Sequence, residues 1–292
     1  MHDLIRHVSK AEHRRSLNKI GIAFLVGTFP LWSPPSAMTE TSKKSPGVSE
    51  SRTAHGEPQG TTNHWNYEGI EGPDHWAMLE PSYMTCEAGR QQSPINIEMP
   101  QHDENQEELT FHYQPTPLTV RNNGHTIQVN YQEGSFLRLN GKPYKLRQFH
   151  FHDPSEHHID GDTYPMEMHL VHQDDKGHTL VLGILMAFGK ENQVFSRAGA
   201  SLKEQTGHRL PPKVSEISTD VPFNVMDLLP SNTHHFSYHG SLTTPPCSEG
   251  VQWIVLKTPI EISKVQGERF VTIIGPNARP LQPLGEREIK EN

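Results

Sequence analysis

The alternation of phenylalanine and histidine in Gln148–His152 constrains the fold of this chain more than any other feature. In a β-strand, side chains two residues apart point to the same face of the sheet. His150 and His152 would therefore share one face, and Phe149 and Phe151 would share the other. The pattern predicts a strand that presents two imidazoles to one side.

A second run with the same alternation follows a short loop later, in Met166–Val171. As a strand, this run would place Glu167, His169 and Val171 on one face. If the two strands pair, three imidazoles converge on one point.

Three neutral histidines that leave a fourth position open are the ligand set of a catalytic zinc ion, whereas closed structural sites are usually rich in cysteine. Each metal-bound histidine also needs an acceptor for its other ring N–H, and Gln148 and Glu167 lie on suitable faces. The alternative is that His-x-His arises by chance in a chain with 20 histidines. The added His169 and the flanking strand pattern favour the metal site.

The composition sets wider limits. A chain of 292 residues can form one large β-rich domain or two smaller ones. Its net charge of −8 argues against nucleic-acid binding, which needs a basic stripe. The two cysteines, Cys86 and Cys247, are either unrelated buried thiols or, in an exported protein, a disulfide.

The N-terminal region predicts export. A basic stretch over residues 1–19 precedes the apolar run Ile20–Trp32, as in a secretory signal. That run is short for a membrane span and contains Pro30, so we expect no stable span in the mature form. Residues 1–38 are predicted to be a signal peptide, with an uncleaved N-terminal anchor as the alternative. Residues 39–62 have almost no apolar side chains and are predicted to form a disordered linker.

The remainder of the chain predicts one mainly β domain over residues 63–288, followed by a short tail at 289–292. Helical signals are few, chiefly in Asn192–Leu202, so a large sheet with short peripheral helices is expected. Turn residues separate the strand-like runs, which are Leu118–Val120, Thr126–Tyr131, Phe136–Leu139, Lys145–His152, Glu167–His172, Leu180–Phe188 and Val251–Leu256.

Several blocks, in order, resemble the α-class carbonic anhydrases, and the match runs from about Trp65 to Leu284. The blocks are Gln91–Ile97, Gln148–His152, Pro154–His157, Glu167–His172 and Gly240–Pro246. The resemblance implies a mostly antiparallel twisted central sheet with zinc at the base of a conical cleft. Export and two cysteines are typical of the bacterial periplasmic members.

The resemblance also implies a chemistry. His150, His152 and His169 would hold Zn²⁺, and zinc-bound hydroxide would attack CO₂ to give bicarbonate and a proton. Thr243 would be the gatekeeper, accepting a hydrogen bond from the hydroxide and passing its own proton to Glu156. His125 would be the proton shuttle, although a lone histidine in such a turn is more often simply solvated.

Further roles follow from the resemblance alone. Tyr67, Asn123 and Gln128 would order water, and Asn277 would join Gln148 and Glu167 in supporting the ligands. The wall of the substrate site would comprise Val171, Val181, Leu242 and Trp253, with Thr243 and Thr244 beside them. Core packing explains the four wall residues equally well. Sulfonamides or anions would bind at the open zinc position. A homodimer is compatible with the sequence.

The resemblance implies that Cys86 and Cys247 form a disulfide that tethers the N-terminal arm to the gatekeeper loop. Because the enclosed loop is long, chain entropy predicts roughly 4–5 kcal/mol of stabilisation, less any native strain. Asp153 departs from the tryptophan of many animal members, which affects packing rather than ligation. His172 lies on the face opposite His169 and is predicted to be structural.

Three functions compete: CO₂ hydration, a catalytically inactive recognition module, and a zinc hydrolase that acts mainly on esters. The inactive module is disfavoured because the histidines and Glu156 and Thr243 are all present. Small apolar wall residues favour a small uncharged substrate, which leaves ester cleavage as a side activity. A second metal site at His235 and His239 is a minor alternative.

Overall fold

The structure is a computed structural model that describes residues 65–103, 107–206, 211, 213 and 215–292. The predicted signal peptide and linker lie outside these residues. Within the described part, no helix is both long and apolar enough to cross a membrane.

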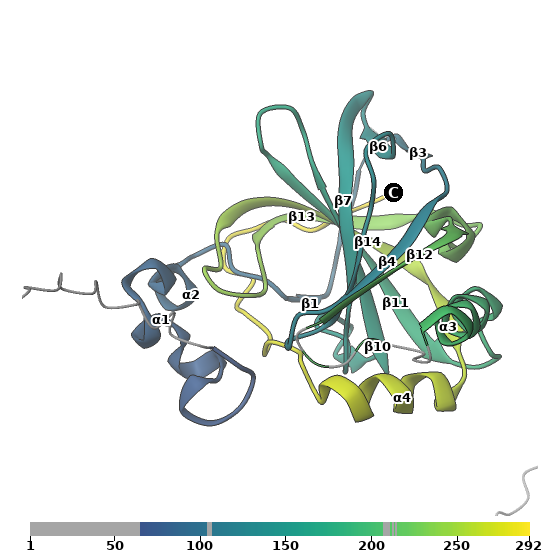
Figure 1. Cartoon of the computed structure of the whole chain (residues 1–292). Helices are drawn as coiled ribbons and strands as arrows, with labels where there is room; N and C mark the ends of the chain where they lie inside the picture. The colour runs from purple at the N-terminus through teal and green to yellow at the C-terminus, as the bar shows by residue number, and fades with distance from the viewer. Residues whose placement is uncertain (1–64, 104–106, 207–210, 212, 214) are drawn as a thin grey trace, which may run out of the picture. The chain divides into compact units, whose positions relative to one another are not determined.

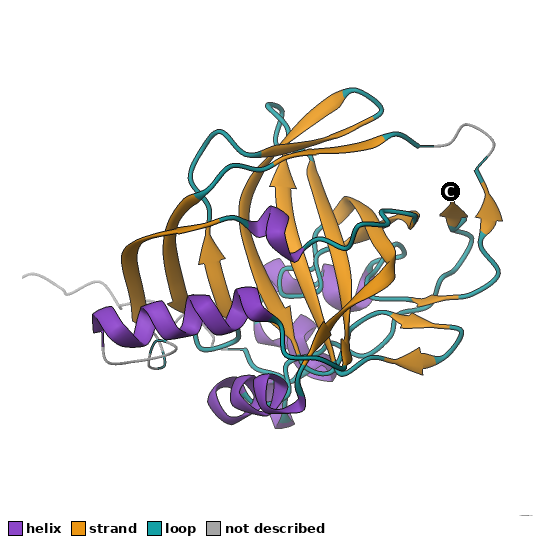
Figure 2. Ribbon diagram, turned by 90° about the vertical axis from the view of Figure 1, so that its right-hand side faces the viewer, coloured by secondary structure: helices purple, strands orange, loops and turns teal. Residues whose placement is uncertain are grey.

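A twisted, mostly antiparallel sheet dominates the described residues (Figures 1 and 2). Ten of its twelve strands follow the order β12-β4-β5-β7-β10-β11-β14-β13-β15-β2, while β6 joins β3 to β7. The pairs β11–β14 and β15–β2 are parallel. The strands are β2 (Gln101–His102), β3 (Leu109–His112), β4 (Thr116–Asn122), β5 (Ile127–Asn130), β6 (Phe136–Leu139), β7 (Lys142–His152), β10 (Met166–Gln173), β11 (Thr179–Phe188), β12 (Ser215–Phe223), β13 (His235–Ser241), β14 (Glu249–Ile262) and β15 (Lys290–Glu291).

Smaller elements surround this sheet. Strands β1 (Asn96–Ile97), β8 (His158–Ile159) and β9 (Asp162–Thr163) form a second, three-stranded sheet. The helices are α1 (Trp76–Leu79), α2 (Thr85–Ala88), α3 (Gln193–Thr206) and α4 (Lys264–Ile274), with 3₁₀ turns at Gly69–Glu71, Pro73–His75, Pro81–Tyr83 and Val225–Leu228.

The mainly β fold class is confirmed, with short helices at the periphery. All seven predicted strands are present, most of them longer than predicted. Helix α4 was missed, although Ser263 and Gln266 form a capping box at its start. Residues 290–291 fell within the predicted tail, but they pair with β13 and β2 inside the sheet.

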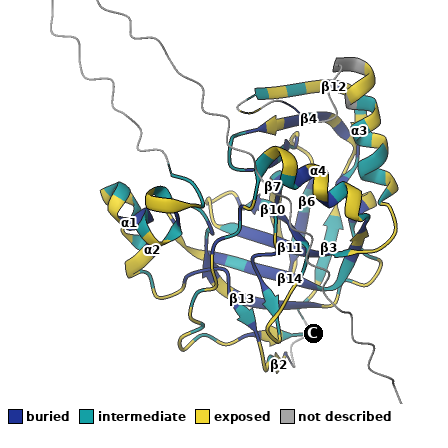
Figure 3. Cartoon of the chain, turned by 90° about the horizontal axis from the view of Figure 1, so that it is seen from below, coloured by how far each residue is buried: buried dark blue, intermediate teal, exposed yellow. Residues whose placement is uncertain are grey.

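The N-terminal arm packs its aromatic residues around a disulfide between Cys86 and Cys247. Trp76 is fully buried in this cluster, and Trp65 and Tyr67 pack against it. The guanidinium group of Arg279 donates to the Cys86 carbonyl at 2.7 Å. Figure 3 shows that the helices of the arm are largely exposed on their outer surface, whereas the central strands are buried.

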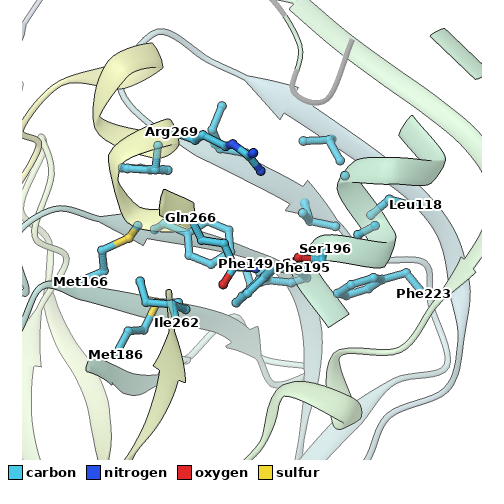
Figure 4. A pocket seen from close by; sticks show the side chains of 17 residues that line it. Leu118, Phe149, Met166, Met186, Phe195, Ser196, Phe223, Ile262, Gln266 and Arg269 are labelled. Carbon is cyan, nitrogen blue, oxygen red and sulfur yellow. Dashed lines mark hydrogen bonds between the residues drawn. The ribbon is translucent and has the colours of Figure 1, made fainter. Parts of the chain in front are cut away.

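The phenylalanine face of β7 packs under helices α3 and α4, on the side away from the histidines. Between these helices and the sheet lies a half-open cavity of about 160 Å³ (Figure 4). Its lining is mainly apolar but includes Ser196, Gln266 and Arg269. Phe149 and Phe151 contribute to it from the sheet, and Gly199 lies on its α3 side. The core behind the histidine strand is therefore not completely filled.

Replacing Gly199 by alanine should raise the free energy of unfolding by about 1 kcal/mol, since alanine is better than glycine by that amount within a helix. The added methyl group also fills part of the cavity. Urea unfolding measures the change. Ala200, exposed on the same helix, supplies the control, because Ala200→Gly should destabilise the protein by a similar amount. A Gly199→Ala protein no more stable than the parent would contradict the prediction.

His172 is buried in the core, as its position opposite His169 predicts. Its Nε2 lies 2.8 Å from the Tyr113 hydroxyl. Burial lowers the pKa of His172 to about 3, so this imidazole stays neutral in the folded protein at ordinary pH.

Because the folded pKa of His172 lies below the unfolded value, only the unfolded chain takes up this proton between about pH 6.5 and pH 3. Stability from this group is therefore complete above pH 6.5 and falls as the pH drops, by up to about 1.4 kcal/mol per pH unit. His172→Gln should flatten that slope in denaturant titrations between pH 4 and 6. Tyr113→Phe, which keeps the imidazole, should not, and equal slopes in parent and His172→Gln would refute the assignment.

Candidate metal centre

The antiparallel register of β7 and β10 brings three histidines together. His150 lies opposite His169, and His152 lies opposite Glu167. One ring nitrogen from each of His150, His152 and His169 falls within 4.8 Å of the other two. These are residues predicted from the strand alternation.

Each histidine has a partner for one ring nitrogen, which leaves the other facing its neighbours. The Nδ1 of His150 lies 2.9 Å from Gln148 Oε1, and the Nδ1 of His152 lies 2.8 Å from the backbone oxygen of Asn277. The Nε2 of His169 lies 2.8 Å from Glu167 Oε1. An acceptor at each of these nitrogens fixes the tautomer and leaves an unprotonated nitrogen for a metal.

Burial keeps these imidazoles neutral. It lowers the pKa of His150 well below the usual range and that of His152 to about 4, and it lowers the pKa of His169 as well. The Nε2 atom of His152 is buried without any hydrogen-bond partner. A buried orphan nitrogen beside two other neutral imidazoles fits a divalent metal such as Zn²⁺, which binds the deprotonated ring.

Glu167 is the buried anion that orders this centre. Its Oε1 accepts from the rings of His169 and His157 at 2.8 and 2.7 Å, and its Oε2 accepts from the backbone N–H groups of Glu156 and His157. Burial alone would raise the pKa of Glu167, but the two imidazoles outweigh burial and hold it well below the usual range. His157, Glu167 and His169 also lie within 4.8 Å of one another. The carboxylate already accepts hydrogen bonds from both rings. We therefore infer that this trio supports the three-histidine cluster and does not form a second metal site.

The network continues away from the histidines. The Nε2 of His157 lies 2.7 Å from the Tyr238 hydroxyl, which lies 2.9 Å from Ser93 Oγ. Ser93 Oγ in turn accepts from the backbone N–H of Ser241, next to the Leu242–Thr243 segment. Buried hydrogen bonds thus connect β10 to the segment that begins at Ser241.

Glu156 lies beside the histidine cluster, with its Oε2 3.8 Å from His169 Nδ1. Its Oε1 accepts from the backbone N–H of Arg279 at 2.9 Å, whereas its buried Oε2 has no hydrogen-bond partner and lies 3.5 Å from His152 Nε2. Burial raises the pKa of Glu156 to about 7, against smaller opposing effects of His169, Arg279 and Thr243. The carboxyl group is thus placed to accept a proton or hydrogen bond near the histidines.

The residues predicted to line the substrate site are neighbours in the sheet. Val171 on β10 faces Val181 on β11, which in turn faces Trp253 on β14. Leu242 packs against the same cluster, and Thr244 is half-buried beside it. The Trp253 indole N–H donates to the Ser241 carbonyl at 2.9 Å, so its polar atom is already satisfied.

Of the residues predicted for proton transfer, His125 lies against the N-terminal arm. The His125 ring stacks on Trp65 at a centroid separation of 3.8 Å. Asn123 Oδ1 accepts from the backbone N–H of His125. The side chain of Asn123 therefore stabilises the turn, a contact that its predicted role in ordering water did not include. Gln128 directs its amide to Asn130, and burial together with Glu156 raises the pKa of Tyr67 well above its usual range.

Sequence reasoning missed several members of this centre. His157, Tyr238, Ser93 and Arg279 are far apart in the chain, and no local spacing connects them. Asn277 was predicted, but its contact with His152 uses the backbone oxygen. The pair His235 and His239 does not form a site among the described residues: His235 is buried near Glu107, and His239 is exposed.

The fold brings together three histidines whose ring nitrogens could hold a divalent metal ion. The profile of the Eukaryotic-type carbonic anhydrase family matches residues 71–292. The chain belongs to this family.

Bacterial relatives and solved structures agree with the assignment. The carbonic anhydrase of Nostoc sp. is 40% identical over 84% of this chain and 92% of its own, and that of Neisseria gonorrhoeae is 41% identical over 80% and 89%. A hyperthermostable carbonic anhydrase from a hydrothermal vent chimney superposes with a TM-score of 0.73 at 41% identity, covering 78% of this chain and 99% of its own. The Thermovibrio ammonificans α-carbonic anhydrase, in complex with the inhibitor sulfanilamide, gives a TM-score of 0.73 at 39% identity with the same coverage.

Glu167→Gln should weaken Zn²⁺ binding roughly 10–100-fold, because the amide has no charge and must turn an N–H₂ toward N–H donors. Competition with a chromophoric chelator measures the affinity. Glu98→Gln, at an exposed carboxylate, is the control and should leave the affinity unchanged. Equal zinc affinity for Glu167→Gln and the parent would contradict the role given to this carboxylate.

Proposed function

We propose that this protein catalyses the reversible hydration of CO₂ to bicarbonate and a proton, with Zn²⁺ held by His150, His152 and His169. The observation that carries the proposal is the convergence of three neutral imidazole nitrogens beside the buried carboxyl group of Glu156. Family membership supports the same activity.

The zinc ion, when bound, acts as a Lewis acid and lowers the pKa of water, an effect for which carbonic anhydrases are themselves the standard example. The protein's own part is orientation. A threonine hydroxyl has one proton, so if Thr243 donates it to Glu156 Oε2, only acceptor lone pairs remain toward the attacking water. The water would then donate one O–H to Thr243 and direct a lone pair at CO₂, while its second proton is the one that the reaction releases.

The wall selects the substrate by its lack of polarity. Val171, Val181 and Leu242 offer no hydrogen bonds, which suits CO₂ and disfavours a charged substrate. A sulfonamide or a small anion would compete at the open metal position, in keeping with the sulfanilamide complex of the Thermovibrio relative. Ester cleavage would be a side activity of the same site.

His125 is the proposed proton carrier. Histidine titrates near neutral pH, so it can take a proton from the site and release it to buffer. Its ring stacks on Trp65, which in turn packs edge-on against Tyr67. The His125 backbone N–H donates to Asn123 Oδ1. Water would complete the path to the metal centre.

An exported location is part of the proposal. A buried disulfide joins the arm to the gatekeeper loop, and disulfides persist in oxidising compartments such as the periplasm. The N-terminal 38 residues would direct export or remain as an anchor.

Stopped-flow CO₂ hydration tests the function. The purified zinc-loaded protein should hydrate CO₂ rapidly. Loss of a residue that only supports a metal ligand costs up to roughly 100-fold in activity, and His169→Ala, which removes a ligand itself, should lower kcat/KM by more than that. A zinc chelator should abolish the activity, and added zinc should restore it.

His239→Ala is the matched control, because His239 is an exposed histidine on β13. It should retain full activity. A folded, zinc-loaded parent without hydration activity would exclude the proposed reaction and favour a recognition module or an ester hydrolase.

A further inference from the structure

The backbone of His125 is held from both sides by asparagine side chains. On one side, Asn123 Oδ1 accepts from the His125 N–H at 2.9 Å. On the other, Asn277 Nδ2 donates to the His125 carbonyl at 2.9 Å. The imidazole ring stacks on Trp65 with only 9° between the planes. His125 is therefore fixed in its main chain and supported at its ring.

Asn277 also forms hydrogen bonds to the end of β7, the strand that carries His150 and His152. Its Nδ2 also donates to the Phe151 carbonyl at 2.9 Å, and its Oδ1 accepts from the Asp153 N–H at 2.8 Å. Its backbone oxygen accepts a hydrogen bond from Nδ1 of the metal-site residue His152 at 2.8 Å. With 1% of its surface exposed, Asn277 uses every polar atom of its side chain within the protein.

These contacts make the Asn277 side chain a direct bridge between the His125 carbonyl and the end of β7 that carries His150 and His152. Strand β5 pairs with β7 from Gln128 onward, and Thr126 Oγ1 bonds to the Phe151 backbone, so the turn is already anchored on that side. The Asn277 amide adds the bond at the His125 carbonyl itself. Proton transfer through water depends steeply on such placement, since a displacement of about 1 Å can cost up to about 100-fold in rate.

We propose that Asn277 is a positioning residue for proton transfer: its side-chain amide sets the separation between His125 and the metal centre. This role is distinct from the support of His152, which comes from the backbone oxygen and survives a side-chain substitution. The proposal rests on the proposed CO₂ hydration and on His125 as its shuttle.

A double-mutant cycle tests the proposal with the full-length zinc-loaded protein. Asn277→Ala should lower kcat about tenfold in weak buffer and change kcat/KM by less than about twofold, because proton release follows the hydration step. In a His125→Ala background, Asn277→Ala should lower kcat no further. Free imidazole should restore kcat in both single variants, because it replaces the misplaced or missing shuttle.

Two further variants separate positioning from stability. Asn277→Asp fills the same space and keeps the acceptor for the Asp153 N–H but loses both donations, so it should reproduce the loss of kcat. Thr126→Val removes the two bonds of Thr126 Oγ1, which donates to the same Phe151 carbonyl and accepts from the Phe151 N–H, but none to the His125 peptide. It should lower the melting temperature and leave the split between kcat and kcat/KM unchanged.

A readout without catalysis comes from Trp65. In the zinc-free protein, protonation of the stacked His125 should quench tryptophan fluorescence with a pH dependence that disappears in His125→Ala. Asn277→Ala should weaken this quenching, and Thr126→Val should not.

Parallel losses of kcat and kcat/KM in Asn277→Ala, or a further tenfold loss in the His125→Ala background, would overturn the proposal and leave Asn277 a structural residue. An inactive parent would instead refute the proposed function. Normal kcat in His125→Ala would refute the shuttle assignment and the positioning role with it.

Discussion

The pairing of β7 with β10 is the constraint on which the rest of the site depends. The register sets His169 opposite His150 and Glu167 opposite His152, so a shift by one residue would turn every side chain of one strand to the other face. The buried phenylalanine side of β7 makes such a shift costly, because it would expose Phe149 and Phe151 and bury the histidines against α3 and α4. Hydrophobic burial on one face thus fixes the geometry of the histidines on the other.

The buried charge of Glu167 turns that geometry into a stable arrangement. An ionised carboxylate in the interior is tolerated only when its acceptors are satisfied, and here two rings and two backbone N–H groups satisfy them. The same contacts fix the tautomers of His169 and His157. Glu156 is the contrast, since one of its oxygens has no partner and burial raises its pKa to about 7. The two carboxyl groups differ in proton affinity because two imidazoles in direct contact offset the burial of Glu167, whereas burial dominates at Glu156.

Long-range contacts bind the remaining parts to the two strands. The disulfide ties the arm to the loop that contains Cys247 across 161 residues, and Arg279, two residues after Asn277, donates to the Cys86 carbonyl in the arm. Asn277 itself joins the His125 turn to β7. The centre is consequently assembled from four distant segments, and its precision depends on side-chain and backbone hydrogen bonds that cross between them.

The amino-acid sequence was enough to predict the strand alternation, the mainly β fold class, the family and, given that the two strands pair, the convergence of His150, His152 and His169. These features are local or follow from a period of two residues, which the pleat of a strand imposes. Only the tertiary structure decided that the Asn277 backbone oxygen contacts His152, that His157, Tyr238 and Ser93 extend the Glu167 network, and that a cavity lies behind β7. Contacts between residues so far apart in the chain have no repeating pattern, because they arise from how packed elements meet and not from the conformation of any one segment.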